Sequence, residues 1–350
     1  MRRAVRTVAC AAVAGALLAG AAASSAAVDA LPRSTTDRPD DATGPQVHAL
    51  YVLPSDGVDR ALDTTGTVAA SFANWQRWLQ GQTFNNGLRL DTTGGELDVT
   101  FVRLGRTDAQ LAARGPSLRD AIEDELRAKG ILRAGKVYAA YYDGSSTAAC
   151  GGGAWPPRLP GAVAALYLRA TYGPGATCYE PERSRAGLQI MDFAMLHELF
   201  HTMGYVPSCA PNHTRDGHVS DSPRDLMYAG DEPWRPAVLD VGSDDYFHAH
   251  ILGCAEFAVS RYLDRGFGGA SAKVKLTVSV SGAGRVLSTP RGIACSTRCT
   301  ATFERGMRLT LRALPPKGAR FAGWGGACRG AKSCRVTLDR GRAVTARFRR

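Results

Sequence analysis

The stretch His197-Glu198-Leu199-Phe200-His201, which continues through Thr202-Met203-Gly204, organises the rest of the chain. Residues four apart on an α-helix lie on one face, so the two histidines can offer imidazole nitrogens to one metal ion. Glu198 directly follows the first histidine, where a carboxylate can take a proton from metal-bound water without being a ligand. The pattern predicts a zinc site with His197 and His201 as ligands and Glu198 as general base.

The residues on either side of this stretch favour a buried helix. Residues 190–196 are apolar apart from Asp192 and contain neither Gly nor Pro,. Gly204 suits the end of that helix. The chain has seven histidines, so a chance match to the spacing is the alternative to a metal site.

A catalytic zinc usually has three protein ligands and one open position, so a third ligand is expected. The Gly- and Pro-containing loop 205–221 holds two histidines and two aspartates. We take His218 as the third ligand, because Gly217 gives the chain freedom to turn and Asp221 could orient the imidazole. His213 and Asp221 are the alternatives from the same loop.

A further alternative is Glu256, in the predicted helical run 254–263, because some zinc peptidases take their third ligand from a later helix. Asp225-Leu226-Met227-Tyr228 follows the ligand-rich loop. Met is an adaptable apolar residue, and Tyr can donate a hydrogen bond to an oxyanion. Met227 as an ordinary core residue is the simpler interpretation of that side chain.

From Asp192 to Tyr228 the chain resembles the metzincin clan of zinc peptidases, with Asp225-Leu226-Met227-Tyr228 similar to the Met-turn of that clan. The clan places its third ligand three residues after the glycine, where this chain has Pro207. The resemblance implies a secreted zinc endopeptidase with an α+β, mixed-sheet catalytic domain. Glu198 would accept a proton from zinc-activated water and pass it to the leaving amine, and Tyr228 would stabilise the oxyanion.

The N-terminal residues 1–27 have the pattern of an export signal: three arginines, an apolar Ala-rich run, and Ser25-Ala26-Ala27 as a cleavage site,. A membrane anchor is the alternative, but the apolar run is short and no second one exists, so we expect no transmembrane segment in the mature chain. Residues 28–45 are polar and contain Pro, which predicts a flexible linker or a short pro-segment. We expect a secreted, extracellular or cell-wall-associated protein.

Without Cys10, which lies in the predicted signal, eight cysteines remain. An even number in an exported chain favours disulfide bonds. Four lie in the central region and four near the C-terminus, and each set allows three pairings. Our choice for the central set is Cys150 with Cys178 and Cys209 with Cys254. Zinc binding by thiolates is the alternative, although the terminal spacings suit it poorly.

Residues 46–266 are predicted to form the catalytic domain, in which strand-like and helix-like runs alternate. Strands are expected at 47–53, 97–102, 137–142 and 163–168, and helices at 67–79 and 117–129. The Gly- and Pro-rich segment 144–157 is predicted to be a surface loop that a disulfide could hold and that could shape a substrate cleft. The length suffices for one large core.

Residues 267–272 form a small-residue linker, after which 273–350 have a different composition. This region carries 18 Lys and Arg against two acids, a net charge of about +16, whereas the central region is near −8,. Alternating apolar residues with Gly and Pro turns predict a small all-β domain. Phe321-Ala-Gly-Trp324-Gly-Gly-x-Cys328 and the flanking cysteines make the region similar to the divergent bacterial InlB-type B repeat, an accessory module of exported proteins.

The expected partners follow from this division. A protein or peptide is the predicted substrate of the zinc site. The basic C-terminal domain could attach to an anionic cell-wall polymer. Nucleic acid is disfavoured as a partner, because the protein is expected to be exported and the aromatic candidates are assigned to the core. The alternatives are a cell-envelope binding or adhesion protein with a structural or inactive zinc site, and a zinc hydrolase that cleaves another bond.

Overall fold

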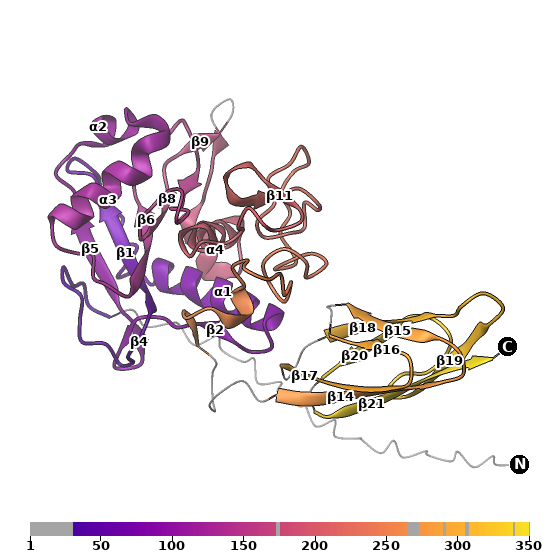
Figure 1. The fold of residues 1–350 in the computed structure, drawn as a ribbon. Coiled ribbons are helices and arrows are strands. Elements are labelled where there is room, and N and C mark those ends of the chain that lie inside the picture. Colours follow the sequence, from indigo (N-terminus) through magenta and orange to yellow (C-terminus); the bar gives the residue numbers. More distant parts are fainter. Residues whose placement is uncertain are drawn as a thin grey trace, which may run out of the picture.

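The computed structural model describes residues 31–172, 176–264, 273–289, 292–304, 308–338 and 340–349. The predicted signal peptide 1–27 and linker 267–272 lie outside these ranges. The described residues form three hydrophobic core clusters, two from residues before position 264 and one from residues after position 273. The helices belong to the first part, and the second consists of strands (Figure 1). None of the described helices is long and apolar enough to span a membrane.

A five-stranded mixed sheet forms the centre of the larger unit, in the order β5-β1-β6-β8-β7. Four strands are parallel, and β7 joins the edge antiparallel to β8. Their bounds are Gln46–Leu53 (β1), Val99–Arg103 (β5), Lys136–Tyr142 (β6), Gly151–Gly152 (β7) and Val163–Tyr167 (β8). The parallel strands are mostly apolar, as expected of a sheet covered on both faces,. The mixed α+β class is confirmed.

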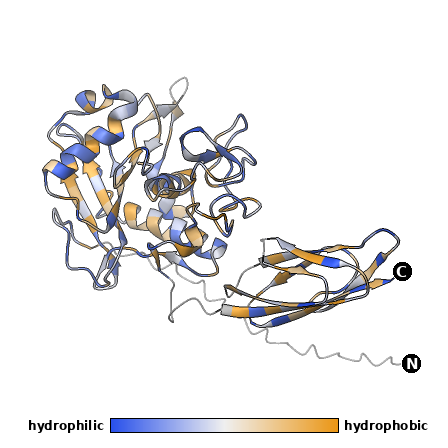
Figure 2. Ribbon diagram, in the orientation of Figure 1, coloured by the Kyte–Doolittle hydropathy of each residue, from blue (hydrophilic) through white to orange (hydrophobic). Residues whose placement is uncertain are grey.

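Helices cover both faces of this sheet (Figure 1). On one face, α1 (Thr67–Gln82) and α4 (Ile190–Thr202) pack with alternate residues of β1, β6 and β8. On the other face lie α2 (Asp108–Ala112) and α3 (Leu118–Ala128). Apolar and polar residues are mixed along α3 (Figure 2). α4 is apolar over most of its length. α4 therefore lies inside the unit, with His201 buried and His197 partly buried,.

Short strands complete the larger unit. They are β2 (Gly87–Leu88), β3 (Thr92–Thr93), β4 (Glu96–Leu97), β9 (Thr171–Tyr172), β10 (Ala176–Thr177), β11 (His213–Thr214), β12 (His218–Val219) and β13 (Leu263–Asp264). The single strand predicted at 97–102 is split at Asp98, whose buried carboxylate accepts a hydrogen bond from the backbone N–H of Arg38. The prediction of a helix at 254–263 is wrong, because only Phe257–Val259 form a short 3₁₀ turn there.

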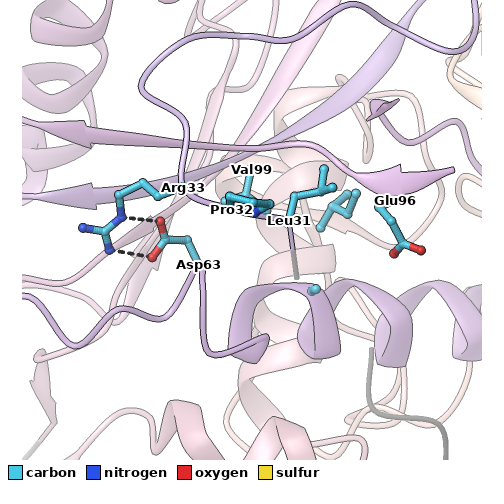
Figure 3. Close-up of a pocket in the computed structure, with 8 residues that line it drawn as sticks. Leu31, Pro32, Arg33, Asp63, Glu96 and Val99 are labelled. Atoms are coloured by element: carbon cyan, nitrogen blue, oxygen red, sulfur yellow. Dashed lines mark hydrogen bonds and ion pairs between the residues drawn. The ribbon is translucent and has the colours of Figure 1, made fainter. Parts of the chain in front are cut away.

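The segment 31–45, part of the predicted flexible linker, packs against the larger unit. The Arg33 guanidinium pairs with the buried Asp63 carboxylate at 2.7 Å (Figure 3). The Lys136 ammonium lies 2.8 Å from Asp37. The structure thus differs from the expected mobile linker, because the polar side chains of this segment meet charged partners on the folded unit.

The second unit is a β-sandwich, which confirms the predicted all-β region. Its two sheets have the orders β17-β14-β21-β19 and β16-β15-β18-β20, and their inner faces form one apolar core. The strands are Lys273–Ser281 (β14), Arg285–Thr289 (β15), Ala294–Cys295 (β16), Arg298–Glu304 (β17), Arg308–Leu314 (β18), Arg320–Gly326 (β19), Cys334–Thr337 (β20) and Arg342–Arg349 (β21). Trp324 is buried in this core, as expected.

Four disulfides connect the eight cysteines. Cys150 pairs with Cys178 and Cys209 with Cys254, which confirms the predicted central pairing. The pairing that the sequence left open is Cys295 with Cys299 and Cys328 with Cys334. The thiolate zinc alternative is therefore excluded for these residues, since a disulfide sulfur is not a thiolate ligand.

Candidate metal centre

The helix α4 carries the first two histidines of the site. The carboxylate of Asp192 accepts a hydrogen bond from the backbone N–H of Gln189, the residue before the helix, at 2.8 Å. An acidic side chain bonded in this way stabilises a helix N-terminus. Gly204 follows the other end with a φ of 90°, a conformation that favours glycine and ends the helix,. The predicted helix and its end at Gly204 are therefore confirmed.

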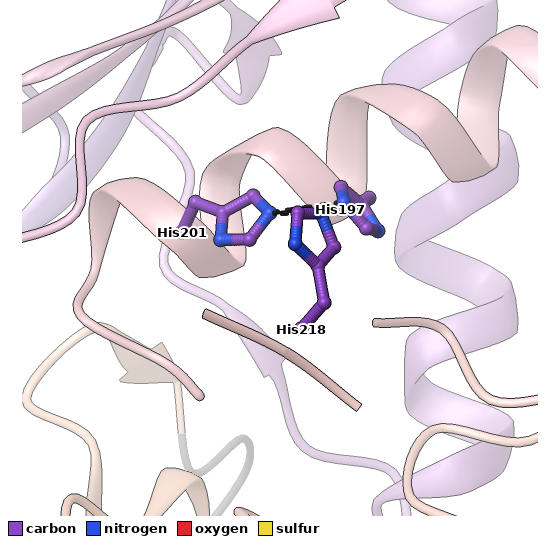
Figure 4. A group of neighbouring side chains, drawn as sticks. All are labelled: His197, His201 and His218. Atoms are coloured by element: carbon purple, nitrogen blue, oxygen red, sulfur yellow. Dashed lines mark hydrogen bonds between the residues drawn. The ribbon is translucent and has the colours of Figure 1, made fainter. Parts of the chain in front are cut away.

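Three imidazoles meet beside α4 (Figure 4). The Nε2 atom of His201 lies 3.0 Å from His197 Nε2 and 3.1 Å from His218 Nε2. One ring nitrogen from each lies within 4.8 Å of the others. The structure thus brings His218, chosen as the third ligand, to the pair on the helix.

The ring of His197 is oriented by the backbone of the Met-turn-like segment. Its Nδ1 lies 2.7 Å from the carbonyl oxygen of Leu226. A carbonyl oxygen can only accept, so Nδ1 carries the proton and the Nε2 lone pair faces the other two histidines. A carbonyl partner of this kind is a common support for a metal-binding histidine.

The hairpin of β11 and β12 positions His218 at the start of its second strand. Gly217 precedes it with a φ of 78°, and a Cβ there would lie 2.6 Å from the Trp155 ring. The His218 Nδ1 lies 3.3 Å from the carbonyl oxygen of Arg215. The predicted orienting role of Asp221 is therefore wrong, because the backbone of the turn itself supplies the acceptor.

The other proposed third ligands lie elsewhere. His213 stacks on Trp155, with ring centroids 5.8 Å apart. The Glu256 carboxylate accepts hydrogen bonds from the backbone N–H groups of His248, His250 and Ala258. Neither these two residues nor Asp221 belongs to the histidine group among the described residues.

The protonation of the three histidines suits a metal ion. Burial, followed by the neighbouring imidazoles, lowers the pKa of His197 to about 3 and that of His201 well below its ordinary value. Burial also lowers the pKa of His218. Neutral imidazoles whose lone pairs converge are the form that binds a transition metal. The donor set, three nitrogens without a thiolate, fits a catalytic zinc.

Glu198 lies on the same helix, partly buried. Burial raises the pKa of its carboxyl to about 8, and a dication held by the histidines would lower it again by charge attraction. Burial and then the Glu198 charge raise the pKa of Tyr179. A carboxyl group whose pKa lies near neutral pH, next to a metal, can both accept and return a proton.

The edge strand β7 lies against Glu198, a feature that the sequence indicated only as a loop near a cleft. A Cβ added to Gly151 would lie 3.0 Å from Glu198 Oε1. A Cβ on Gly153 would lie 2.6 Å from the Glu198 carbonyl oxygen and 2.8 Å from His201 Cβ. The Cys150–Cys178 disulfide holds the start of this strand. Glycine is needed at these positions because the strand backbone approaches α4 closely.

The Met-turn-like segment is buried and hydrogen-bonded to the hairpin. Met227 is fully buried, and its carbonyl oxygen accepts the backbone N–H of Val219 at 3.0 Å. The Tyr228 hydroxyl accepts the backbone N–H of Glu232 at 3.1 Å. Trp234, which sequence reasoning missed, packs edge-on against His197 at 5.5 Å. A lone tryptophan in an irregular segment gave no signal of this contact.

Comparison with known proteins identifies the C-terminal region. Residues 275–350 match the family described as the divergent InlB B-repeat domain, which confirms the resemblance seen in the sequence. No curated protein matches the chain.

Among solved structures, the chain is similar to OgpA from Akkermansia muciniphila. The wild-type protein matches at 13% identity and a TM-score of 0.34, covering 89% of this chain and 96% of that one. Catalytically inactive OgpA, in complex with an O-glycopeptide (glycodrosocin) substrate, matches at 12% identity and a TM-score of 0.32, covering 92% of this chain and 98% of that one. A likeness at this level carries no argument about this chain.

Proposed function

We propose that this protein is a secreted zinc-dependent endopeptidase. The observation that carries the proposal is the convergence of His218 on His197 and His201, beside a glutamate on the same helix. A zinc held only for structure has no need of a carboxylate next to its first ligand. The four disulfides support export, because such bonds persist outside the cytoplasm,.

Each residue of the site has a separate role in the proposed peptide hydrolysis. His197, His201 and His218 would hold the zinc ion, which when bound supplies Lewis-acid activation of a water molecule and of the substrate carbonyl. Glu198 accepts a proton on a carboxylate oxygen and returns it to the leaving amine. Tyr228 is assigned the stabilisation of the oxyanion.

A peptide is the substrate class that the edge strand favours. β7 pairs with β8 on one side and forms the end of the described sheet, next to the Glu198 carboxylate. An extended peptide can add to such an edge through main-chain hydrogen bonds, which recognise the backbone itself. Cleavage within a chain, rather than at its end, agrees with recognition of this kind.

The test combines zinc content with proteolysis of casein for the wild-type protein and for Glu198→Gln. We expect one zinc per chain in both proteins and casein cleavage only by the wild type. Zinc without cleavage in either protein would favour a cell-envelope binding protein or a hydrolase that acts on another bond. Cleavage by Glu198→Gln at the wild-type rate would remove the general-base role.

We also propose that the B-repeat region attaches the enzyme to an anionic cell-wall polymer. Exposed basic residues lie on strands of both sheets of the sandwich, namely Lys275, Arg285, Arg298, Arg312, Arg320, Arg335, Arg347 and Arg349. Charge spread in this way attracts polyanions without a single pocket. We expect the chain to sediment with teichoic-acid-containing cell walls at low salt and to be released at high salt. Equal sedimentation with walls stripped of teichoic acid would contradict the attachment.

A further inference from the structure

A second group of possible metal ligands lies outside the histidine site, in the loop 240–245. One carboxylate oxygen from each of Asp240, Asp244 and Asp245 lies within 4.8 Å of the others. Asp240 and Asp245 are buried, while Asp244 is exposed, so an ion can reach the group from solvent. Among the described residues, none of the ion pairs involves these three carboxylates. Their mutual repulsion is therefore not relieved by a basic side chain of that part of the chain.

The buried carboxylate of Asp240 is a second observation, besides the clustering of the three aspartates, that points to a bound cation. Asp240 is only 4% exposed. Its Oδ2 accepts backbone N–H groups from Asp245, Tyr246 and Phe247, at 3.3, 2.9 and 2.7 Å. Its Oδ1 is buried and has no hydrogen-bond partner in the described residues. A buried oxygen without a partner is costly, and a cation would supply the missing interaction.

The donor atoms of Asp240, Asp244 and Asp245 indicate which kind of ion this group would bind. The group offers carboxylate oxygens and neither imidazole nor thiolate, which suits a hard cation rather than zinc,. Calcium accepts six to eight oxygen ligands in flexible geometry, whereas magnesium demands a near-ideal octahedron and keeps much of its water. Three carboxylates gathered by one short loop match the preference of calcium. We propose that Asp240, Asp244 and Asp245 bind a calcium ion.

This site is connected to the hairpin that carries His218. The Asp245 carboxylate accepts hydrogen bonds from the backbone N and the Nδ2 of Asn212, at 2.7 and 3.1 Å. The Asn212 carbonyl oxygen in turn accepts the backbone N–H of Ser220 at 3.2 Å. Asn212 and Ser220 flank the paired strands β11 and β12. A calcium ion that fixes Asp245 would therefore fix the base of this hairpin.

The first test is a calorimetric titration of the purified, zinc-containing chain with CaCl2, together with its thermal unfolding midpoint with and without calcium. We expect one calcium per chain and a higher midpoint in its presence. MgCl2 at the same concentration is expected to leave the midpoint unchanged. Zinc content is measured in each sample, so that a failure of the calcium site is distinguished from a failure of the histidine site.

Asp244→Asn is the informative variant, because Asp244 is exposed and the change keeps the backbone hydrogen bonds of Asp240 and Asp245. We expect calcium affinity to fall by at least about tenfold. Asp231→Asn, a change of an exposed aspartate outside the group, should bind calcium as the wild type does. Terbium luminescence sensitised by Tyr246 in the wild type, and its loss on adding calcium, gives a measurement that needs no variant.

Three results would overturn the proposal. One is the absence of calcium binding, with an unchanged unfolding midpoint and no terbium signal that calcium displaces. Another is wild-type calcium affinity in Asp244→Asn. The third is an equal effect of magnesium, which would remove the assignment to calcium.

Discussion

The Nδ1 of His197 donates a hydrogen bond to the carbonyl oxygen of Leu226 across 2.7 Å. This bond connects the helix that carries the HExxH pattern to the Met-turn-like segment, which lies almost thirty residues later in the chain. The contact is made by the backbone before Met227, so the segment fixes the direction of the His197 lone pair through a carbonyl group. Support of this kind sets the tautomer of a metal ligand and its basicity.

The choice of His218 over His213 can be tested by a matched pair of variants. His218→Ala removes one of three converging nitrogens, so we expect zinc affinity to fall by at least about a hundredfold and proteolysis to be lost. His213→Ala removes a ring stacked on Trp155 and should retain one zinc per chain. Zinc content by atomic absorption after dialysis distinguishes the two. Zinc loss in His213→Ala alone would reverse the assignment.

The close approach of β7 and the residue after it to α4 predicts a strong effect at Gly153. In Gly153→Ala the new methyl group would meet the Glu198 carbonyl oxygen and His201 Cβ, so this segment and the helix must separate. We expect a loss of stability of about 1–3 kcal/mol and lower activity. Gly81→Ala, in α1 with no atom within 4 Å of the new methyl group, is the control and should be neutral or stabilising,. Equal stability of the two variants in urea would argue against the tight contact.

The role assigned to Tyr228 predicts a separation of zinc binding from catalysis. Tyr228→Phe keeps the ring and removes the hydroxyl, which accepts the backbone N–H of Glu232. We expect full zinc content, an unchanged KM and a kcat lower by about 10- to 100-fold, because the lost donor acts in the transition state. A wild-type kcat would restrict Tyr228 to a structural role.

The pH dependence of stability is predicted from Asp143, which is fully buried. Burial opposes its ionisation, but hydrogen bonds from Arg60 and Arg169 prevail and lower the pKa below its ordinary value. The folded state therefore binds this proton more weakly than the unfolded state does. The resulting stability is present above about pH 4 and is lost as the pH falls through the folded pKa.

Removing this carboxylate charge should lower stability at neutral pH. We expect Asp143→Asn to cost about 2 kcal/mol at pH 7, a value reduced to allow for the partial exposure of both arginines,. The cost should shrink as the pH approaches 2. Urea unfolding from pH 2 to 8 measures this, with Asp231→Asn as the control. A cost that does not vary with pH would show that packing, not charge, is responsible.

Periodic sequence signals predicted the main elements well. The apolar run before His197 and the glycine after Met203 defined α4, because helix burial and helix termination each depend on local residues. The C-terminal strands were predicted because the alternation of apolar and polar residues along a strand is also a local pattern. Local pattern failed at residues 254–263, where Glu256 binds the backbone N–H groups of a turn instead of continuing a helix.

The candidate metal site was only partly predictable from the sequence. The spacing of His197 and His201 is a property of one helix. The placement of His218 depends on a hairpin whose turn contains Gly217, and Gly217 lies against the ring of Trp155. The contacts of Gly151, Gly153 and Trp234 arise between segments far apart in sequence, so no local pattern encodes them. The same holds for residues 31–45, whose charged partners lie on other elements.

We propose that three histidines hold a catalytic zinc ion. The most direct measurement is X-ray absorption at the zinc edge on the purified chain. We predict one zinc per chain with three nitrogen ligands at about 2.0–2.1 Å and one oxygen, and one nitrogen fewer in His218→Ala. A chain without zinc, or a zinc whose ligands are unchanged in His218→Ala, would contradict this proposal.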